Sequence, residues 1–339
     1  MARRNRLAWW GSLALTPAIL WAAMVLVWAG APGGQTPLWR VVMAIVWLTA
    51  VVVALRRLRA RTALGVCALL WLPVGLFFVT LSPSNERDWE APSSRTAWAR
   101  VEGGQVTLHN IRDFRYAPDG AWTEAWYDAT FDLHELEESF FVLTEFGGID
   151  GLAHVMVSFR FAGDRFVVLS VEIRRQVGET YNPIGGAFRQ YELFYVAADE
   201  RDAVALRTLV HGDPTWVIPM RAGREKTAAF FLDMVERMNA LRLRPAWYNT
   251  LTSSCATNLA THYERVNQVR LGLDLRIFLP GFSDQLLEEL GLLPEGVDRA
   301  RARDRFLVNE RARMDDNSAC FSLAIRGEVP PGGPCPSPR

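Results

Sequence analysis

Long apolar runs fill the first 82 residues of the chain. Residues 8–29 carry no charged side chain, and residues 38–55 and 63–82 form two further apolar segments with Arg40 as their single charge. Each is close to the ~20 residues that a helix needs to cross a bilayer. A cleaved signal peptide fits the first segment less well, because its apolar run is too long and two more follow. The pattern therefore predicts three transmembrane helices.

From residue 101 onward, strand-like and helix-like patterns mix. Alternating or β-prone stretches predict strands, and amphipathic stretches predict helices. The expected strands lie within 102–115, 123–131, 140–144, 153–161, 166–174, 191–197 and 215–220, and the expected helices over 199–207, 225–243, 256–270 and 282–292. The fold class is α+β, with a mainly antiparallel sheet and packed helices. The predicted organisation is a membrane anchor over 1–82, a polar linker over 83–100, an exported domain over 101–325 and a disordered tail over 326–339.

One hairpin can be placed in register from its pattern. AHVMVSFRF (153–161) and FVVLSVEIR (166–174) both alternate, and Gly163 lies between them. A three-residue loop centred on Gly163 gives one continuous apolar face, whereas a two-residue loop would pair apolar with polar positions. The apolar cross-strand pairs are then Val155 with Val171, Val157 with Leu169 and Phe159 with Val167. On the other face His154 lies opposite Glu172, at a Cβ separation of ~4.5–5.5 Å.

Basic residues indicate the orientation in the membrane. The first 82 residues contain no Asp or Glu, and their basic clusters are Arg3, Arg4 and Arg6 before the first segment and Arg56, Arg57, Arg59 and Arg61 before the third. Cytoplasmic loops are enriched in Arg and Lys, so we expect both clusters in the cytoplasm and the loop near Gly33 outside. Arg40 departs from this rule. The predicted location is the inner membrane, with the N-terminus in the cytoplasm and the chain after about Ser82 in the periplasm.

Composition and cysteines narrow the function classes. Net charge is zero, which gives no bulk attraction to nucleic acid. The His and Cys residues lack metal-ligand spacing, and the sequence has no phosphate loop or GxSxG elbow, so no metal or cofactor is expected. Cys67 falls within the third apolar segment, and Cys320 and Cys335 could pair in an oxidising compartment. Cys255 is then left unpaired.

The unpaired Cys255 stands at the predicted start of a helix. Thr252, Ser253 and Ser254 are good N-cap residues, and 256–270 contains no Gly or Pro. The N–H groups and the positive dipole end at a helix N-terminus favour a thiolate, and they can lower a cysteine pKa to between ~3.5 and ~7.5. Cys255 is therefore a candidate nucleophile. The alternative is a small, buried and inert residue.

A thiol nucleophile needs a base, and the base needs an orienting group. His154 and Glu172 are the candidates. The alternatives are a sheet histidine without a catalytic role and a carboxylate that is solvated or paired with an arginine of its own face. His262 follows Cys255 by two helical turns, roughly 10 Å, which is too far to take the thiol proton. The Cys255 N–H and the Asn249 side chain would stabilise an oxyanion, unless Asn249 is only a turn residue.

Six motifs follow one another along the chain: HNIRDFRY (109–116), AHVMVSFRF (153–161), SVEIR (170–174), YELFYVAADERD (191–202), YNTLTSSCATN (248–258) and LPGFSDQLLEELGLL (279–293). Together they resemble a bacterial periplasmic family, the one named for the N-terminal domain of Lnb, the lipoprotein intramolecular transacylase. The resemblance covers roughly residues 95–325. By motif position, the reactive residues of the family correspond to Cys255 and His154.

The resemblance implies a Cys/His acyl-transfer enzyme at the outer face of the membrane. The characterised activity moves an acyl chain from the diacylglyceryl-modified cysteine of a lipoprotein to that cysteine's α-amine, although many members have no assigned activity. A cysteine helix on a His-bearing sheet, with the His first in sequence, is also similar to a permuted papain-type arrangement. Ser253 and Ser254 stand where members often carry Asn, a change that we expect to alter the oxyanion site and leave the nucleophile intact.

Three function classes are compatible with these patterns. The first is an acyltransferase or thiol hydrolase that acts on lipid or lipoprotein esters, with membrane lipids and lipoproteins as partners. The second is a permuted cysteine peptidase or amidase of the cell wall, and the third is a non-enzymatic envelope assembly protein. A peptidase predicts an open polar groove, whereas an acyltransferase predicts an apolar slot. The sequence leaves the acyl donor, the acceptor and the oligomeric state open.

Overall fold

The computed structural model describes residues 2–30, 37–117, 120–149, 151–315 and 318–335, with side chains from residue 15 onward. The chain divides into two compact units. The first is formed by Met1–Glu90, Arg174–Glu192 and Ala246–Thr250, and the second by Ala91–Ile173, Leu193–Pro245 and Leu251–Arg339. Two segments from the middle of the sequence therefore pack with the N-terminal unit.

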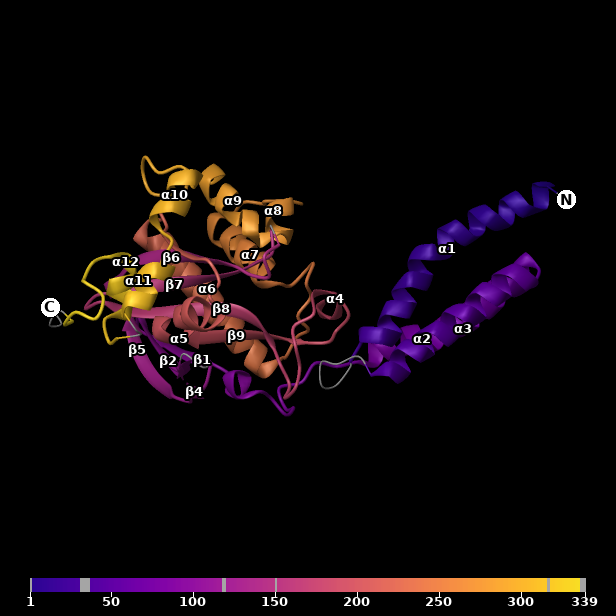
Figure 1. Cartoon of the computed structure of the whole chain (residues 1–339), viewed down its shortest axis with the longest axis horizontal. Coiled ribbons are helices and arrows are strands. Elements are labelled where there is room, and N and C mark those ends of the chain that lie inside the picture. The colour runs from indigo at the N-terminus through magenta and orange to yellow at the C-terminus, as the bar shows by residue number, and fades with distance from the viewer. Residues whose placement is uncertain (1, 31–36, 118–119, 150, 316–317, 336–339) are drawn as a thin grey trace. The chain divides into compact units, whose positions relative to one another are not determined.

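Three helices lead the first unit: α1 (Ala2–Trp28), α2 (Leu38–Arg57) and α3 (Ala60–Thr80) (Figure 1). By length and composition, α2 and α3 are able to cross a membrane, whereas the apolar stretch described in α1, Leu15–Trp28, is shorter. The described residues thus support two candidate spans and not the three that the sequence predicts, because a span needs ~20 apolar residues. The loop near Gly33 lies outside the described residues.

The three helices pack through aromatic rings and one buried arginine. The rings of Trp21 and Trp71 lie 5.4 Å apart. Arg40 is buried, and its guanidinium donates to the Val27 carbonyl (3.5 Å) and the Ala29 carbonyl (2.7 Å). Carbonyls at the end of a helix lack intrahelical partners and attract cations. Arg40 therefore departs from the rule that basic residues lie on the cytoplasmic side for a local reason. Its side chain donates hydrogen bonds to the free carbonyls at the C-terminus of α1.

The two later segments are tied to the first unit by hydrogen bonds. Arg189 donates to the Phe78 carbonyl in the last turn of α3 (2.6 Å). Arg87 donates to the Glu192 carboxylate, also at 2.6 Å. The short helix α4 (Pro183–Gly186) accepts a 2.6 Å bond from Thr250 at its first carbonyl. These contacts explain why segments distant in sequence belong to one compact body.

An eight-stranded sheet forms the centre of the second unit. Its strands are β1 (Trp98–Glu102), β2 (Gln105–Arg112), β5 (Trp126–Asp132), β6 (Leu136–Glu145), β7 (Ala153–Phe161), β8 (Arg165–Arg174), β9 (Glu192–Ala198) and β10 (Thr215–Pro219). Their order is β1-β2-β9-β8-β7-β6-β10, with β5 paired to β2. Only β2 and β9 are recorded as a parallel pair among the described strands. The prediction of a mainly antiparallel sheet is confirmed. Strand β1 begins inside the segment that the sequence predicted as a linker. A separate two-stranded sheet, formed by β3 (Arg115–Tyr116) and β4 (Trp122–Thr123), was not predicted.

The predicted hairpin register is also confirmed. β7 and β8 pair Val157 with Leu169, and Phe161 with Arg165 across a loop of three residues. Residues of odd number in β7 therefore share one face of the sheet, and residues of even number share the other. This division determines which helices each side chain meets.

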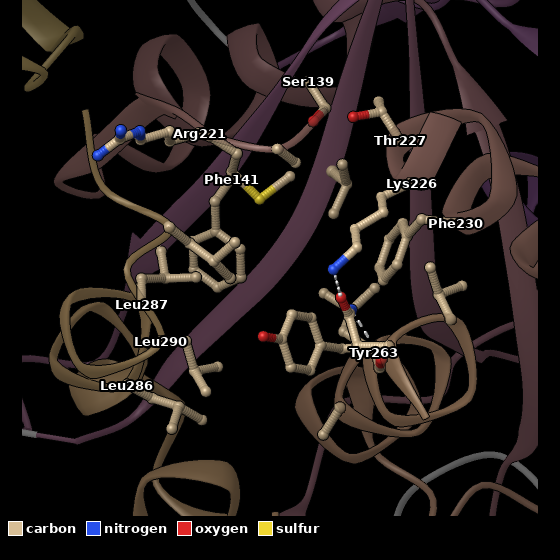
Figure 2. A pocket seen from close by; sticks show the side chains of 18 of the residues that line it. Ser139, Phe141, Arg221, Lys226, Thr227, Phe230, Tyr263, Leu286, Leu287 and Leu290 are labelled. Atoms are coloured by element: carbon tan, nitrogen blue, oxygen red, sulfur yellow. Dashed lines mark hydrogen bonds between the residues drawn. The ribbon is translucent and has the colours of Figure 1, made fainter. Parts of the chain in front are cut away.

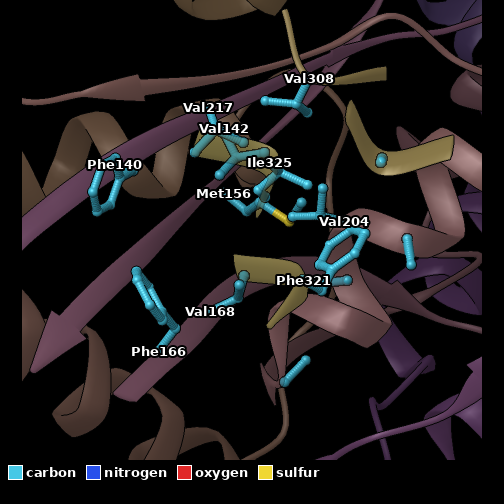
Figure 3. Packing of buried hydrophobic residues seen from close by; sticks show 14 of the residues in the cluster. Phe140, Val142, Met156, Phe166, Val168, Val204, Val217, Val308, Phe321 and Ile325 are labelled. Carbon is cyan, nitrogen blue, oxygen red and sulfur yellow. The ribbon is translucent and has the colours of Figure 1, made fainter. Parts of the chain in front are cut away.

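Helices cover the two faces of the sheet. On the odd face, α6 (Arg224–Leu243) and α7 (Cys255–Asn267) pack, and the Phe231 ring lies 4.9 Å from the Phe159 ring. On the even face, α5 (Glu200–Ala205), α11 (Asn309–Asp315) and α12 (Phe321–Arg326) enclose a core that includes Met156, Val168 and Phe321 (Figure 3). The remaining helical elements are α8 (Leu275–Phe278), α9 (Ser283–Glu289), α10 (Arg299–Arg305), the π-helix η3 (Leu206–His211), and the short 3-10 turns η1 (Ala91–Ser93), η2 (Leu133–Glu135) and η4 (Pro280–Phe282). The helices predicted near 199–207, 225–243, 256–270 and 282–292 are all present.

The C-terminal segment is tied back to the second unit. Cys320 and Cys335 form a disulfide with their Cα atoms 5.3 Å apart. The Gly332 N–H also donates to the Asp315 carboxylate (2.9 Å). The segment predicted as a disordered tail is described as far as Cys335, and residues 336–339 lie outside the described part.

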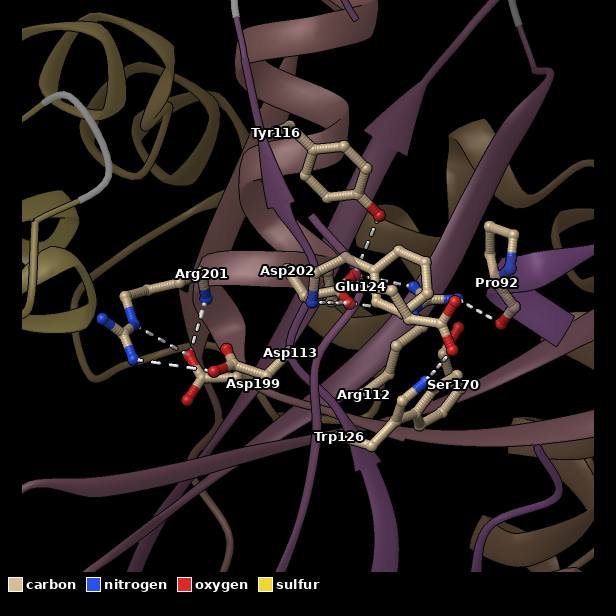
Figure 4. A network of polar contacts seen from close by, with 12 residues as sticks. Pro92, Arg112, Asp113, Tyr116, Glu124, Trp126, Ser170, Asp199, Arg201 and Asp202 are labelled. Carbon is tan, nitrogen blue, oxygen red and sulfur yellow. Dashed lines mark hydrogen bonds and ion pairs between the residues drawn. The ribbon is translucent and has the colours of Figure 1, made fainter. Parts of the chain in front are cut away.

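A buried ion pair joins β2 to α5. Arg112 and Asp202 are both buried and make two hydrogen bonds of 2.8 Å (Figure 4). Asp202 also accepts from the Phe114 N–H (2.8 Å) and the Tyr116 hydroxyl (3.2 Å). Such a pair is tolerable inside a protein only because every polar atom finds a partner.

We expect Asp202→Ala to lower the free energy of unfolding by about 3–5 kcal/mol, because it leaves the Arg112 guanidinium buried without a counter-charge. Denaturant unfolding of the full chain in detergent, followed by tryptophan fluorescence, measures this loss. Asp304→Ala is the matched control, since Asp304 is exposed. Equal unfolding midpoints for the two variants would contradict the prediction.

Candidate catalytic site

Cys255 is the first residue of α7. Ser254 is the N-cap, with its hydroxyl accepting from the Thr257 N–H (3.3 Å) and its own N–H donating to the Thr257 hydroxyl (2.7 Å). This reciprocal pair is a capping box. The predicted helix start is confirmed, and the Ser254 side chain is occupied by the cap.

The Cys255 sulfur lies against the strand that carries His154. Sγ accepts a hydrogen bond from the backbone N–H of Val155, the residue after His154. The pairing of β7 with β8 extends only to Met156 and Ser170. The Val155 N–H is thus just beyond the paired region, and the sulfur is its partner there. The α7 helix packs on the odd face of the sheet, whereas the His154 side chain belongs to the even face and contacts Ser170 there.

His154 is held by a hydrogen-bonded chain on the even face. Its Nε2 lies 2.8 Å from the Ser170 hydroxyl, which donates to Glu172 Oε1 at 3.0 Å. The direct distance from His154 Nε2 to Glu172 Oε1 is 3.8 Å, too long for a hydrogen bond. Arg207 donates to the same carboxylate oxygen at 3.0 Å. Sequence reasoning paired His154 with Glu172 but missed Ser170 as the bridge and Arg207 as the counter-charge.

Burial and neighbouring charges set the protonation states of this chain. Burial, with a contribution from Arg207, lowers the pKa of His154 to about 4. Burial raises the pKa of Glu172, but the positive charges of Arg207 and Arg112 outweigh it and lower that pKa to about 2. At neutral pH the imidazole is therefore uncharged and the carboxylate is charged.

The thiol is protonated as well. Burial raises the pKa of Cys255, and the Glu172 charge adds to the rise, while N–H groups of Val155, Ala256 and Cys255 itself oppose it without cancelling it. The sequence predicts a thiolate favoured by the helix N-terminus, and this expectation is wrong for the resting protein because desolvation of the sulfur dominates. Both the thiol of Cys255 and the imidazole of His154 are therefore neutral at neutral pH.

A second buried chain fixes α7 on the sheet. His262 Nδ1 contacts the Asp233 carboxylate on α6 (2.5 Å), and its Nε2 contacts the Tyr195 hydroxyl on β9 (2.7 Å). That hydroxyl donates to the Asn258 side chain (3.3 Å), which in turn donates to the Ser254 carbonyl (2.8 Å). Ser254, the residue before Cys255, is thereby connected to α6 and β9. The sequence analysis excluded His262 as the base, and its contacts give it a positioning role.

The third sequence-predicted group, Asn249, belongs to the first unit. Its side chain donates to the Ala187 carbonyl there (3.2 Å). Its oxyanion role stays a prediction. The donors at the sulfur itself are the N–H groups of Val155, Ala256 and Cys255.

An apolar cavity of about 660 Å³ extends from this region along α7 (Figure 2). Val155 and Ala256 line it beside the sulfur. Phe141 lies on the sheet side, and the leucines of α9 face the α7 side chain of Tyr263 across the space. Further apolar lining residues are Val157, Met220, Phe230, Leu259, Ala260, Val266, Leu271, Ile277, Leu286, Leu287, Leu290 and Leu292. Among the described residues, no group of three or more His, Cys, Asp or Glu side chains is arranged to hold a metal ion.

We expect Ser254→Ala to lower the free energy of unfolding by about 1 kcal/mol, because it removes the hydroxyl that caps α7. The alkylation rate of Cys255 should rise, since fraying of the first turn exposes the sulfur. Ser318→Ala, which changes the same side chain outside α7, is the control. An unchanged midpoint and an unchanged alkylation rate would show that the cap is dispensable.

Residues 122–282 match the family model of the Lnb N-terminal periplasmic domain. The match includes His154, Glu172 and Cys255. No curated protein and no solved structure matches the chain. Two apolar helices precede the matched region, as suits a periplasmic, envelope-associated protein. Over residues 122–282 this chain is therefore similar to the Lnb N-terminal periplasmic domain family.

Proposed function

We propose that this chain is a membrane-anchored acyl-transfer enzyme of the periplasm, with Cys255 as nucleophile and His154 as general base in a permuted papain-like order. The main support is the hydrogen bond from the Val155 N–H to the Cys255 sulfur. It brings the thiol to the end of β7 at which His154 stands. The neutral state of His154 is the second support, because only an uncharged imidazole can accept the thiol proton.

The first half-reaction forms a thioester. His154 removes the Cys255 proton as the sulfur attacks the carbonyl carbon of a lipid-linked ester. The N–H groups of Cys255 and Ala256 stabilise the negative oxygen that forms. When the carbon–oxygen bond breaks, the leaving alcohol takes the proton from His154. The acyl group then remains on the sulfur.

The second half-reaction releases the acyl group. An amine, or water, attacks the thioester carbonyl and passes its proton to His154. The carbon–sulfur bond breaks, and the sulfur recovers a proton from the imidazolium. Transfer to an amine gives an amide, as in the family's characterised reaction on lipoproteins, and transfer to water gives a free acid.

The anchor supplies proximity to the substrate. We propose that α2 and α3 cross the bilayer, with the catalytic unit on its periplasmic side. A site held beside the membrane meets lipid-linked esters at a high effective concentration. Membrane lipids and lipoproteins are accordingly the proposed partners.

The apolar cavity favours acyl transfer over the alternatives. A cell-wall peptidase or amidase acts on polar glycan and peptide groups, whereas most residues that line this cavity are apolar. A purely structural protein has no need for a neutral imidazole on a buried polar chain next to a thiol. The alkylation rate of Cys255 at neutral pH does not distinguish an enzyme from a structural protein. Burial raises the pKa of Cys255, so a slow rate is expected for both.

We expect Cys255→Ala and His154→Ala each to abolish release of p-nitrophenol from a short-chain p-nitrophenyl ester, because both residues act in one covalent step. The purified full chain in detergent is the enzyme. Cys67→Ala and His211→Ala are the matched controls and should keep full activity. Normal turnover in either site variant, with the fold intact by circular dichroism, would exclude the mechanism.

We expect kcat/KM to stay level from about pH 8 down to pH 5 and to fall only as the pH approaches 4. The active imidazole is the unprotonated form, and its pKa is lowered to about 4, so activity is present above that value and lost below it. Ser170→Ala should reduce the rate at every pH, because His154 loses its bridge to Glu172, and Glu172→Gln should do so partially. An acid limb near the ordinary histidine value of ~6.5 in the wild-type chain would contradict the buried arrangement.

A further inference from the structure

The α4 segment, residues 181–189, contains the short helix α4 and belongs to the first unit. We infer that it lies in the headgroup layer of the bilayer, with the Ile184 side chain at the edge of the hydrocarbon. Its partner is a phospholipid surface, and the contact is apolar. The inference rests on the proposed crossing of the bilayer by α2 and α3, and it is independent of the chemistry proposed for Cys255.

The α4 segment packs against the ends of the N-terminal helices. The Phe188 side chain packs on the apolar cluster that α1 and α3 form. The Arg189 guanidinium donates to the carbonyls of Phe78 (2.6 Å) and Leu81 (3.4 Å). These two carbonyls flank Thr80, the last residue of α3. A helix that crosses a bilayer ends near the boundary between hydrocarbon and headgroups, so the α4 segment lies at that boundary.

Two glycines decide which side of α4 faces outward. Gly185 and Gly186 are buried. A Cβ atom on the first would overlap the Gln190 side chain, and a Cβ atom on the second would overlap the Thr250 hydroxyl. The Ile184 side chain is instead 47% exposed. Close packing at the glycines therefore turns Ile184 away from the protein. A single exposed isoleucine is common on soluble proteins, and its position beside the end of α3 is what points to lipid.

Exposed aromatic rings occur at the same level of the first unit. Tyr181 in the α4 segment is exposed, and so is Trp39 in the first turn of α2. Arg40 donates to the Ala29 carbonyl at the end of α1 (2.7 Å), which places the start of α2 beside that end. Trp and Tyr side chains are enriched where a membrane meets water, because their rings are apolar and carry one polar group. The α4 segment thus adds to an aromatic belt that the helices begin.

The α4 segment offers the membrane no charge. Residues 180–188 (TYNPIGGAF) contain no charged side chain, and Arg189 is engaged with the carbonyls at the end of α3. A contact made by apolar side chains depends little on lipid charge, whereas a polybasic contact needs anionic lipid and weakens with salt. Since the α4 segment joins β8 to β9 in the sequence, the exported part of the chain makes this membrane contact in addition to the anchor.

A fluorescent probe at Ile184 tests the contact in the full chain. Cys67→Ala and Cys255→Ala remove the free thiols and leave the Cys320–Cys335 disulfide in place. Ile184→Cys is then labelled with a nitrobenzoxadiazole dye and reconstituted into phosphatidylcholine vesicles. Val101→Cys is the matched control, because Val101 has the same 47% exposure and belongs to the second unit.

The dye at Ile184 should emit at shorter wavelength than the dye at Val101. It should lose emission to lipids that carry bromine close to the glycerol, and less to lipids that carry it near the chain ends. Neither result should change when phosphatidylglycerol is added or when the salt concentration is raised. Tyr181→Cys supplies a second position in the α4 segment, so that the test stands if the labelled Ile184 variant loses its circular dichroism spectrum.

Leu69→Cys, near the middle of α3 and exposed, separates failure of this inference from failure of the anchor. Quenching at Leu69 by bromine near the chain ends, with a water-like and unquenched signal at Ile184 and Tyr181, would overturn the membrane contact and leave the crossing intact. No quenching at Leu69 would remove the crossing and the inference with it. Equal quenching at Val101 would show that the dye itself enters the bilayer, which also overturns the assignment.

A protein partner on the α4 segment gives a different result. A dye at Ile184 that emits at short wavelength but is not quenched by any brominated lipid would be covered by protein, which contradicts the inference. Disulfide cross-linking of the unlabelled Ile184→Cys chain would then identify a second copy as the cover. The ester assay on the chain with Cys255 intact reports the proposed chemistry separately from all of these outcomes.

Discussion

The charge on the half-buried Glu172 carboxylate is the constraint on which the site depends. A buried carboxylate is costly unless cations and hydrogen bonds compensate for its lost hydration. Arg207 and the Ser170 hydroxyl contact it directly, and Arg112 contributes at longer range. Ser170 is then fixed as a donor to the carboxylate, which leaves its oxygen lone pairs available to a proton on His154 Nε2. The Glu172 charge thus orients the His154 imidazole through the Ser170 hydroxyl, without a direct hydrogen bond between the two side chains.

The same burial sets the protonation of the proposed nucleophile. Many cysteine enzymes store a thiolate next to an imidazolium, whereas here both groups are neutral because desolvation raises the pKa of Cys255 and lowers that of His154. In the proposed mechanism, proton transfer therefore accompanies attack on the substrate. A neutral resting thiol is also less prone to oxidation than a thiolate, which is an advantage in a compartment where Cys320 and Cys335 are joined.

Two hydrogen-bonded chains hold the candidate residues. One runs from Arg207 to His154 on the even face of the sheet, and the other runs from Asp233 through His262 to the residues before Cys255. Each is made of side chains from different elements, so neither forms before the sheet and helices have packed.

The sequence by itself determined the local features. Alternation specified the hairpin and its register, because a shift of one residue would turn every apolar side chain outward, and hydroxyl residues before Cys255 specified the start of α7. Tertiary structure decided everything that depends on distant segments: the Ser170 bridge, the Arg207 partner, the role of His262, the cavity along α7, and the joining of 174–192 and 246–250 to the N-terminal helices. It also reversed the expected protonation of Cys255. Helix position is readable in a sequence, but desolvation depends on how much of the folded protein surrounds the sulfur, and no local pattern records that.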